Sequence, residues 1–156
     1  MNTKEIFEHY TESTFYAIEL TSKYIKRMGL NYFNKIHMEI SPEEFLALDV
    51  IMLNPGLCQR DLAKEILKDR AGTGRILLSL EAKGMVERFV ATKGNRLVRT
   101  MKLTPKGEET RKKCESILTP SILKIREKFT EKDSEELKRI LKKLRKILSD
   151  NVETQI

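Results

Sequence analysis

The sequence predicts a mainly helical α+β protein with one small β-hairpin, and three observations support this fold class. Apolar residues recur at three- and four-residue spacing over most of the chain, as at Leu137, Ile140, Leu141 and Leu144. Helix-start signals precede several of these segments. Only residues 86–103 alternate apolar and polar side chains as a hairpin does, so the sheet is expected to be small.

The first predicted helix extends from about Thr3 to Phe33, and its apolar stripe needs a packing partner. The second begins at Ser41-Pro42, where a capping hydroxyl, a proline at the first helical position and Glu44 form a capping box. It is expected to stop at residues 54–56, an Asn-Pro-Gly sequence.

Two short amphipathic helices are predicted next, over residues 59–66 and 70–83, with a polar turn between them. Gly84 follows the second, as expected of a residue that closes a helix in the left-handed conformation. The hairpin comes after it, with its turn at residues 92–95. Helix, turn, helix and β-wing in this order form a winged helix-turn-helix, whose second helix enters the major groove of DNA.

The C-terminal third is predicted to be helical. Thr104-Pro105 starts a helix that Pro120 is expected to bend or break, with a resumption over residues 121–129. Residues 130–133 cap a last helix with a continuous apolar stripe. The end helices expose apolar faces that the central unit cannot cover, so we expect them to pack in a two-fold interface between two subunits. An antiparallel bundle within one chain is the alternative.

Residues 62–88, which end in LEAKGMVER, and the segment LTPKG at 103–107 resemble the MarR family of transcriptional regulators. The resemblance implies a homodimer with a winged helix-turn-helix DNA-binding domain over residues 41–104. The dimerisation region is then formed by residues 1–40 and 105–156. It also implies that the second helix, here called the recognition helix, enters the major groove while the wing reaches the adjacent minor groove.

The positive charge lies on the predicted DNA-binding segment. The chain carries a formal net charge of +7, and residues 57–106 alone hold 12 Lys/Arg and 5 Asp/Glu. The two flanking segments cancel each other. This distribution is typical of a phosphate-binding surface, although basic residues that only aid solubility are the alternative.

The resemblance gives the candidate DNA contacts. Arg70 and Arg75 match basic positions of the motif, and Arg75 is expected on a base or a phosphate. Further contacts are expected from the helix starts, the recognition helix and the wing, at Gln59, Arg60, Gly72, Thr73, Ser79, Lys93, Asn95, Arg96 and Arg99. Arg96 is the predicted minor-groove residue, with Lys93 and Arg99 on phosphates.

The chain departs from the family at two places. Residues 71–74 read Ala-Gly-Thr-Gly where small hydroxyl residues are usual, and Thr73 takes a position that is usually apolar and inward-facing. The glycines are expected either to allow close backbone approach to DNA or to let this turn order on binding. In the wing, Asn95 stands where the family has an acidic residue, which removes the usual partner of the wing arginine.

Cys58 and Cys114 are too few for a disulfide framework, which indicates the cytoplasm. Cys58 precedes a helix and is a candidate redox residue, although a small half-buried residue is the simpler interpretation. His9 and His37 lack metal-ligand spacing, so we expect no metal and no cofactor. No apolar run is long enough for a membrane span.

No constellation of catalytic residues supports an enzyme. We expect a homodimeric repressor of a pseudo-palindromic operator, relieved by an oxidant or by a small aromatic or phenolic effector. The resemblance places that effector beside the elements that carry Tyr16, Tyr24, Arg27, Tyr32 and Phe33. The alternatives are a module that binds an acidic protein partner and a redox or metal switch at Cys58 or His37.

Overall fold

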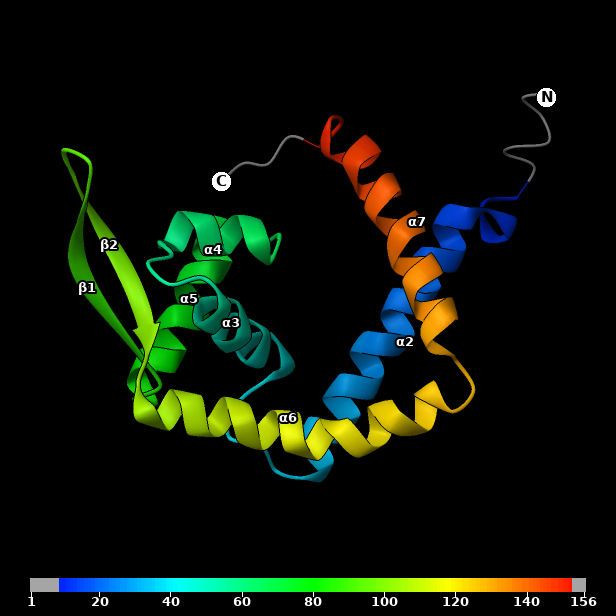
Figure 1. The fold of residues 1–156 in the computed structure, drawn as a ribbon, viewed down its shortest axis with the longest axis horizontal. Coiled ribbons are helices and arrows are strands. Elements are labelled where there is room, and N and C mark those ends of the chain that lie inside the picture. The colour runs from blue at the N-terminus through cyan, green and yellow to red at the C-terminus, as the bar shows by residue number, and fades with distance from the viewer. Residues whose placement is uncertain (1–8, 153–156) are drawn as a thin grey trace. The chain divides into compact units, whose positions relative to one another are not determined.

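The computed structural model describes residues 9–152. In chain order its elements are a short 3-10 helix η1 (Tyr10–Glu12), α2 (Thr14–Lys35), α3 (Pro42–Leu53), α4 (Gln59–Glu65), α5 (Arg70–Ala82), the strands β1 (Val86–Lys93) and β2 (Arg96–Leu103), α6 (Pro105–Arg126) and α7 (Glu131–Ser149) (Figure 1). They confirm the predicted fold class of helices with a two-stranded wing. The chain divides into two compact units, Met1–Pro42 and Glu43–Ile156.

The first long helix begins later than predicted. The Ser13 hydroxyl accepts a hydrogen bond from the backbone N–H of Tyr16 at 3.1 Å, so α2 starts at Thr14. A serine that caps the helix in this way holds an extended backbone conformation, which interrupts the helical pattern ahead of it. The predicted start at Thr3 lies outside the described residues.

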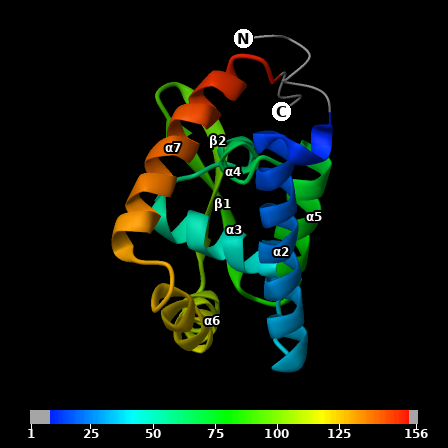
Figure 2. The same cartoon turned by 90° about the vertical axis from the view of Figure 1, so that its right-hand side faces the viewer.

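The core of the second unit lies between α3, α4 and α5, which gather beside the base of the hairpin (Figures 1 and 2). It is formed by side chains with at most 1% of their surface exposed, among them Ala47, Leu48, Leu62, Ala63, Leu77 and Leu80. The boundaries of α3, α4 and α5 follow the predicted start and stop signals within a residue or two. Gly84 has a φ of +71°, which confirms that it closes α5 in the left-handed conformation.

The wing is an antiparallel pair whose register runs from Val86 opposite Leu103 to Lys93 opposite Arg96. This leaves a two-residue loop in which Gly94 has a φ of +60°, a backbone conformation that suits glycine. At its base β2 is held by the backbone of the α3–α4 connection, because the Met101 N–H donates to the Leu57 carbonyl at 3.2 Å.

Of the two predicted effects of Pro120, a bend or a break, the break is wrong, because α6 is one continuous helix with this proline inside it. Thr104 caps the helix by accepting from the Gly107 N–H at 3.1 Å, as expected. Proline removes one backbone hydrogen bond and introduces one steric clash, a local cost of about 3 kcal/mol. A helix with intact hydrogen bonds on both sides can continue through such a defect.

The last helix has the predicted start and stripe. Thr130 and Asp133 form a reciprocal capping box at the start of α7. Its apolar side chains remain accessible in the single chain, with Leu137, Ile140, Ile147 and Leu148 between 39% and 54% exposed. Within residues 9–152, no helix has the length and apolar character that crossing a membrane requires.

Candidate nucleic-acid interface

The recognition helix, α5, presents one buried and one accessible face. Ile76, Leu77 and Leu80 are at most 8% exposed and fix the helix on the core of its unit. Arg70 and Arg75 lie on the accessible face, as the sequence predicts. Helical spacing places Ala71 and Leu78 on this face as well, and Leu78 is 61% exposed. These two apolar residues are absent from the predicted set, because an apolar residue in a helix is normally assigned to the core.

Three predicted contacts on α5 are corrected by the structure. Thr73 is 0% exposed and its hydroxyl donates to the Asp69 carbonyl at 2.8 Å, so its side chain faces the core and cannot reach DNA. Gly72 is also buried, and its N–H donates to the Asp69 carboxylate that caps the helix. The hydroxyl of Ser79, also predicted to contact DNA, donates to the buried carboxylate of Glu44 on α3 at 2.6 Å.

The first glycine of the departure at residues 71–74 has a packing reason. A Cβ at Gly72 would lie 2.7 Å from a carboxylate oxygen of Asp69 and 2.8 Å from the Lys68 side chain. A larger residue at this position would displace the Asp69 carboxylate that caps α5. The glycine therefore allows the turn between α4 and α5 to form. Close backbone approach to DNA is not needed to account for it.

The start of α4 is tied to its neighbours. Gln59 Nε2 donates to the Arg70 carbonyl at 3.4 Å, and Gln59 Oε1 accepts from the guanidinium of Arg88 at 3.3 Å. Gln59 is therefore half-buried and joins α4 to α5 and to the wing. Arg60, the next residue, is exposed. Of the two predicted phosphate contacts at this helix end, only Arg60 presents an accessible charge.

The register of the wing divides its cations between two faces. Arg99 is opposite Val90 and shares the face of Arg88, whereas Lys93 and Arg96 are opposite each other on the second face at the tip. Asn95 is in the exposed loop. The sequence could not assign these faces, because its alternation left the register uncertain by one residue.

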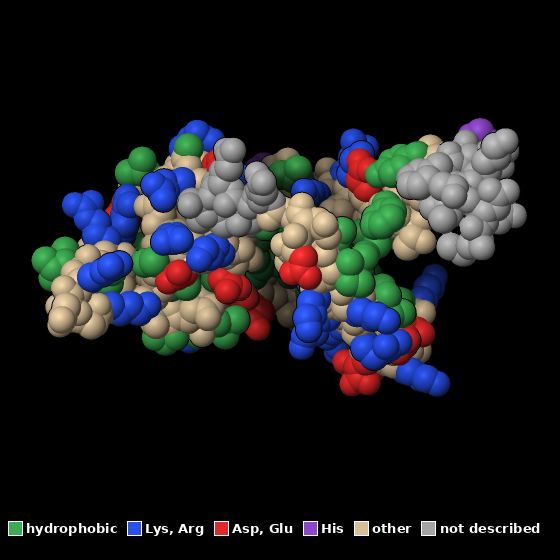
Figure 3. All heavy atoms as spheres, turned by 90° about the horizontal axis from the view of Figure 1, so that it is seen from above, with side chains coloured by type: hydrophobic (Ala, Val, Ile, Leu, Met, Phe, Trp, Pro, Cys, Tyr) green, Lys and Arg blue, Asp and Glu red, His purple; other side chains and the backbone are tan. Residues whose placement is uncertain are grey.

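Six of the predicted contacts are exposed cations without an ion-pair partner in the part of the chain from His9 to Val152. They are Arg60, Arg70, Arg75, Lys93, Arg96 and Arg99. Several other basic side chains of this segment are paired with carboxylates, for example Lys68 with Glu43 at 2.8 Å and Lys83 with Glu44 at 2.8 Å. Figure 3 shows several Lys and Arg side chains on the part of the second unit that holds the wing and α4. The accessible positive charge therefore surrounds α5 and the wing.

The candidate redox residue Cys58 is half-buried at the N-cap position of α4, and its side chain makes no capping hydrogen bond. Its thiol donates to the carboxylate of Asp61 at 3.1 Å, and this hydrogen bond lowers the pKa of Asp61. Cys114 is 1% exposed, and burial raises its pKa to about 11, so its thiolate is scarce at neutral pH. No cluster of His, Cys, Asp and Glu that could hold a metal occurs in residues 9–152.

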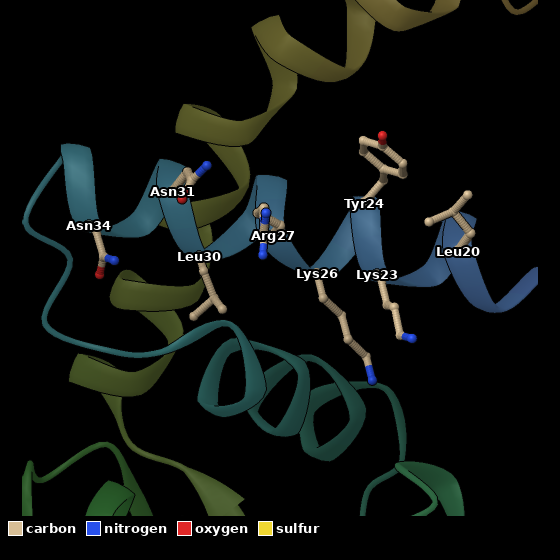
Figure 4. Close-up of a pocket in the computed structure, with 8 residues that line it drawn as sticks. All are labelled: Leu20, Lys23, Tyr24, Lys26, Arg27, Leu30, Asn31 and Asn34. Atoms are coloured by element: carbon tan, nitrogen blue, oxygen red, sulfur yellow. The ribbon is translucent and has the colours of Figure 1, made fainter.

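The first unit offers a concave surface along α2, with a volume of about 630 Å³. It is lined by Leu20, Lys23, Tyr24, Lys26, Arg27, Leu30, Asn31 and Asn34. Figure 4 shows Tyr24 on one side of the helix and Lys23, Lys26 and Leu30 on the other. Tyr24 and Arg27 were predicted to border an effector site, and a smaller neighbouring hollow includes Tyr32. Of the other predicted residues, Phe33 is 5% exposed and Tyr16 packs edge-to-face on Tyr10.

Comparison with known proteins gives the same fold. The chain resembles MepR of Staphylococcus aureus in a DNA complex, with a TM-score of 0.74 and 21% identity over 90% of this chain and 99% of that one. It resembles MarR of Escherichia coli with a TM-score of 0.67 and 23% identity, over 84% and 96% of the two chains. For the transcriptional regulator SlyA the values are 0.72 and 20%, over 88% and 94%.

At these identities the likeness to solved structures establishes the fold. No curated protein sequence matches the chain. The model of the MarR family matches residues 39–96, which contain α3, α4, α5, β1 and the start of β2. This match places the likeness to the MarR family in the winged helix-turn-helix segment, and the solved structures share the fold over most of the chain.

Proposed function

We propose that this protein is a transcription regulator of the MarR family that binds duplex DNA as a homodimer, at a pseudo-palindromic operator, and represses transcription until a small ligand releases it. The MarR family, whose model matches residues 39–96, consists of transcription regulators, and this match supports the proposal. The observation that carries the proposal is the set of six exposed, unpaired cations on α4, α5 and the wing. The DNA complex of S. aureus MepR, a protein of the same fold, supports it.

The accessible face of α5 is the surface we assign to the major groove. Arg75 supplies a guanidinium that can bind guanine through two hydrogen bonds. Leu78, one turn further along and 61% exposed, offers an apolar contact for the methyl group of thymine. Arg70 begins the helix and is assigned to a phosphate. With Arg75 as a polar contact and Leu78 as an apolar contact on one face, the helix can discriminate between bases.

The tip of the wing is the surface we assign to the minor groove. Arg96 is exposed and directly opposite Lys93, so two positive charges flank the loop. A narrow minor groove has a strongly negative potential that attracts arginine. Arg99 lies on the other face of the hairpin and is assigned to the phosphate backbone.

Two copies of the chain are needed for a palindromic site. The apolar stripe of α7 is accessible in the single chain, and α2 exposes Phe15 and Ile25 to at least 55%. Faces of this kind on helices require a partner. A two-fold interface formed by the helices outside the winged domain covers them and holds two recognition helices about one turn of DNA apart.

The concave surface along α2 is the effector site we propose. Tyr24, Leu20 and Leu30 provide apolar contact, and Lys23, Lys26 and Arg27 provide positive charge. A small aromatic or phenolic anion satisfies both features. A ligand bound there releases DNA only if it binds more tightly to a dimer whose recognition helices no longer match the two half-sites.

Binding to DNA fragments from upstream of the chain's own gene tests the proposal, at two salt concentrations and with Arg75→Ala and Arg96→Ala alongside. We expect selective binding that weakens steeply with salt, because phosphate contacts release counterions. Each substitution is expected to reduce the affinity for the preferred fragment about tenfold, the effect of losing one good arginine contact.

Lys102→Ala is the matched control, because Lys102 is a wing cation paired with Glu87 at 3.6 Å. It is expected to change affinity less than twofold, within about 0.4 kcal/mol. Equal, weak binding to every fragment, with no effect of Arg75 or Arg96, would contradict the proposal. That result would favour an acidic protein as the partner of the basic surface.

A further inference from the structure

The side chain of Arg88 joins three elements that carry the proposed DNA contacts. Its Nε donates to the carboxylate of Glu81 on α5 at 2.6 Å, and its Nη2 donates to the second oxygen of the same carboxylate. Its Nη1 donates to Gln59 on α4 at 3.3 Å. Gln59 in turn donates to the carbonyl of Arg70, the first residue of α5. The guanidinium thus links β1 to both ends of the recognition helix.

No other side chain in the described wing makes a hydrogen bond of this kind to the helices α4 and α5. Among residues 9–152, Arg88 is the one side chain of β1 and β2 that hydrogen bonds to α4 or α5. Lys102 pairs with Glu87 of the neighbouring strand, and the hydroxyl of Thr100 is buried without a hydrogen-bond partner. The base of the wing is also attached through backbone groups, such as the Met101 N–H, which donates to the carbonyl of Leu57 in the α3–α4 connection.

Arg88 lies near the base of the hairpin, so a small tilt of the hairpin at this residue produces a large displacement of the wing tip. Five residues separate Arg88 from Lys93 at the end of β1, so the wing extends about 17 Å beyond the contact at the usual strand rise. A tilt of about 10° would therefore move Arg96 by about 3 Å, which is enough to break a hydrogen bond. The electrostatics agree with a firm contact, because the Arg88 hydrogen bonds lower the pKa of Glu81 and Glu81 raises that of Arg88.

We propose that Arg88 and Glu81, supported by Gln59, form a clamp that fixes the wing relative to the recognition helix, so that both can engage DNA at once. Arg88 is then a positioning residue and not a DNA contact. This inference rests on the proposed DNA-binding function, since the clamp matters for binding only if α5 and the wing occupy neighbouring grooves.

The first test needs no DNA. The chain has no tryptophan, so Leu97→Trp, at a position that is 77% exposed, places a unique fluorophore near the wing tip. Time-resolved anisotropy then reports nanosecond motion of the wing. In this background we expect Arg88→Met and Glu81→Gln to lower the residual anisotropy. Lys102→Met, which removes the Lys102–Glu87 pair within the hairpin, should leave it unchanged.

The second test is a double-mutant cycle on a duplex selected by the native protein from a random-sequence pool. In the native background we expect Arg96→Ala to cost about tenfold in affinity. In the Arg88→Met background the same substitution should cost less than about twofold, because the wing no longer presents Arg96 correctly. Arg75→Ala should cost the same factor in both backgrounds. Glu81→Gln repeats the cycle if Arg88→Met fails to fold.

The outcomes are distinct. Unchanged anisotropy together with an Arg96→Ala effect of equal size in both backgrounds would overturn the clamp, whether Arg88 is then a DNA contact or a stabilising residue. A clamp that orders the wing in a protein that selects no duplex would leave the clamp intact and contradict the proposed function instead.

Discussion

Glu44 is a buried charge at which α3 and the recognition helix meet. Its side chain accepts from Ser79 at 2.6 Å and from the Lys83 ammonium at 2.8 Å through each oxygen, and the residue is 6% exposed. Removing one partner of a buried ion pair leaves an uncompensated charge. The orientation of α5, and so of Arg75, depends on this contact.

Glu44→Ala is expected to lower the free energy of unfolding by about 3 kcal/mol, because Lys83 and Ser79 lose their partner in a partly buried site. Glu43→Ala is the control on the same turn, since Glu43 forms an exposed pair with Lys68 and should contribute less than about 1 kcal/mol. Urea unfolding of both variants measures the difference. Equal effects would mean that Glu44 is not a structural anchor.

Sequence reasoning identified the accessible arginines but not the side chains that the fold itself uses. Arg70, Arg75 and Arg96 follow from charge and spacing, because exposed cations at these positions have few alternatives. Thr73 and Ser79 are short polar residues that can bond either to DNA or to the protein, and only the packing of α5 shows that both hydroxyls have partners within the chain. The Arg88–Glu81 pair was missed because its partners are brought together by the start of β1.

At the scale of elements, the contact between β1 and α5 should depend on pH. The Arg88 hydrogen bonds hold the pKa of Glu81 below its ordinary value of 4.5, so the unfolded chain takes up a proton at Glu81 more readily than the folded chain. The contribution of the pair is therefore fully present above about pH 4.5 and is lost as the pH falls through the lower folded-state value.

The expected result is that native protein and Arg88→Met differ in stability at neutral pH and converge below pH 4.5, the ordinary pKa of Glu81. Urea unfolding at a series of pH values from neutral to 3 measures this difference. A gap that stays constant on acidification would show that Arg88 stabilises the wing by packing rather than through the carboxylate.

The helix α6 shows where element prediction succeeded and where it did not. Its start at Thr104-Pro105 was readable, because a capping hydroxyl followed by proline has one common structural use. Its continuation through Pro120 could not be predicted from the sequence. The proline rule gives the free-energy cost of proline inside a helix, but whether the helix continues depends on the rest of the structure. The long helix at the N-terminus was misjudged for a related reason, since the capping role of Ser13 outweighs the helical spacing before it.

Pro120→Ala is expected to stabilise the protein, by about 1–3 kcal/mol, because it restores a backbone hydrogen bond in an exposed helix interior. The alanine variant also has a more flexible unfolded chain, which reduces the gain. Thermal and urea unfolding measure the change. A loss of stability would show that the proline ring makes a contact in the assembled protein that alanine cannot replace.

At the scale of the whole molecule, the apolar faces outside the winged domain call for a second subunit. The stripe on α7 is accessible in the single chain, with Ile140 48% and Ile147 54% exposed. The division into dimerisation and DNA-binding regions remains a prediction. The sequence indicates that such faces exist, but the partner they meet belongs to the assembly and cannot be read from one chain.

Ile140→Glu combined with Ile147→Glu is expected to convert a dimer into a monomer, because each substitution places a charge in the proposed interface. Lys142→Glu, on the polar side of the same helix, should leave the dimer intact. Sedimentation equilibrium distinguishes the two results. A native protein that is monomeric at micromolar concentration would contradict the two-fold interface.

The most direct test of the account is the affinity of the native protein for its selected duplex before and after five base pairs are inserted between the half-sites. The insertion turns one half-site to the opposite side of the DNA, since B-DNA repeats about every 10.5 base pairs. A dimer with two fixed recognition helices is expected to lose at least about 100-fold in affinity, about 2.7 kcal/mol. Unchanged affinity would show that the subunits do not bind two half-sites together, and would contradict the proposal of a dimeric operator-binding regulator.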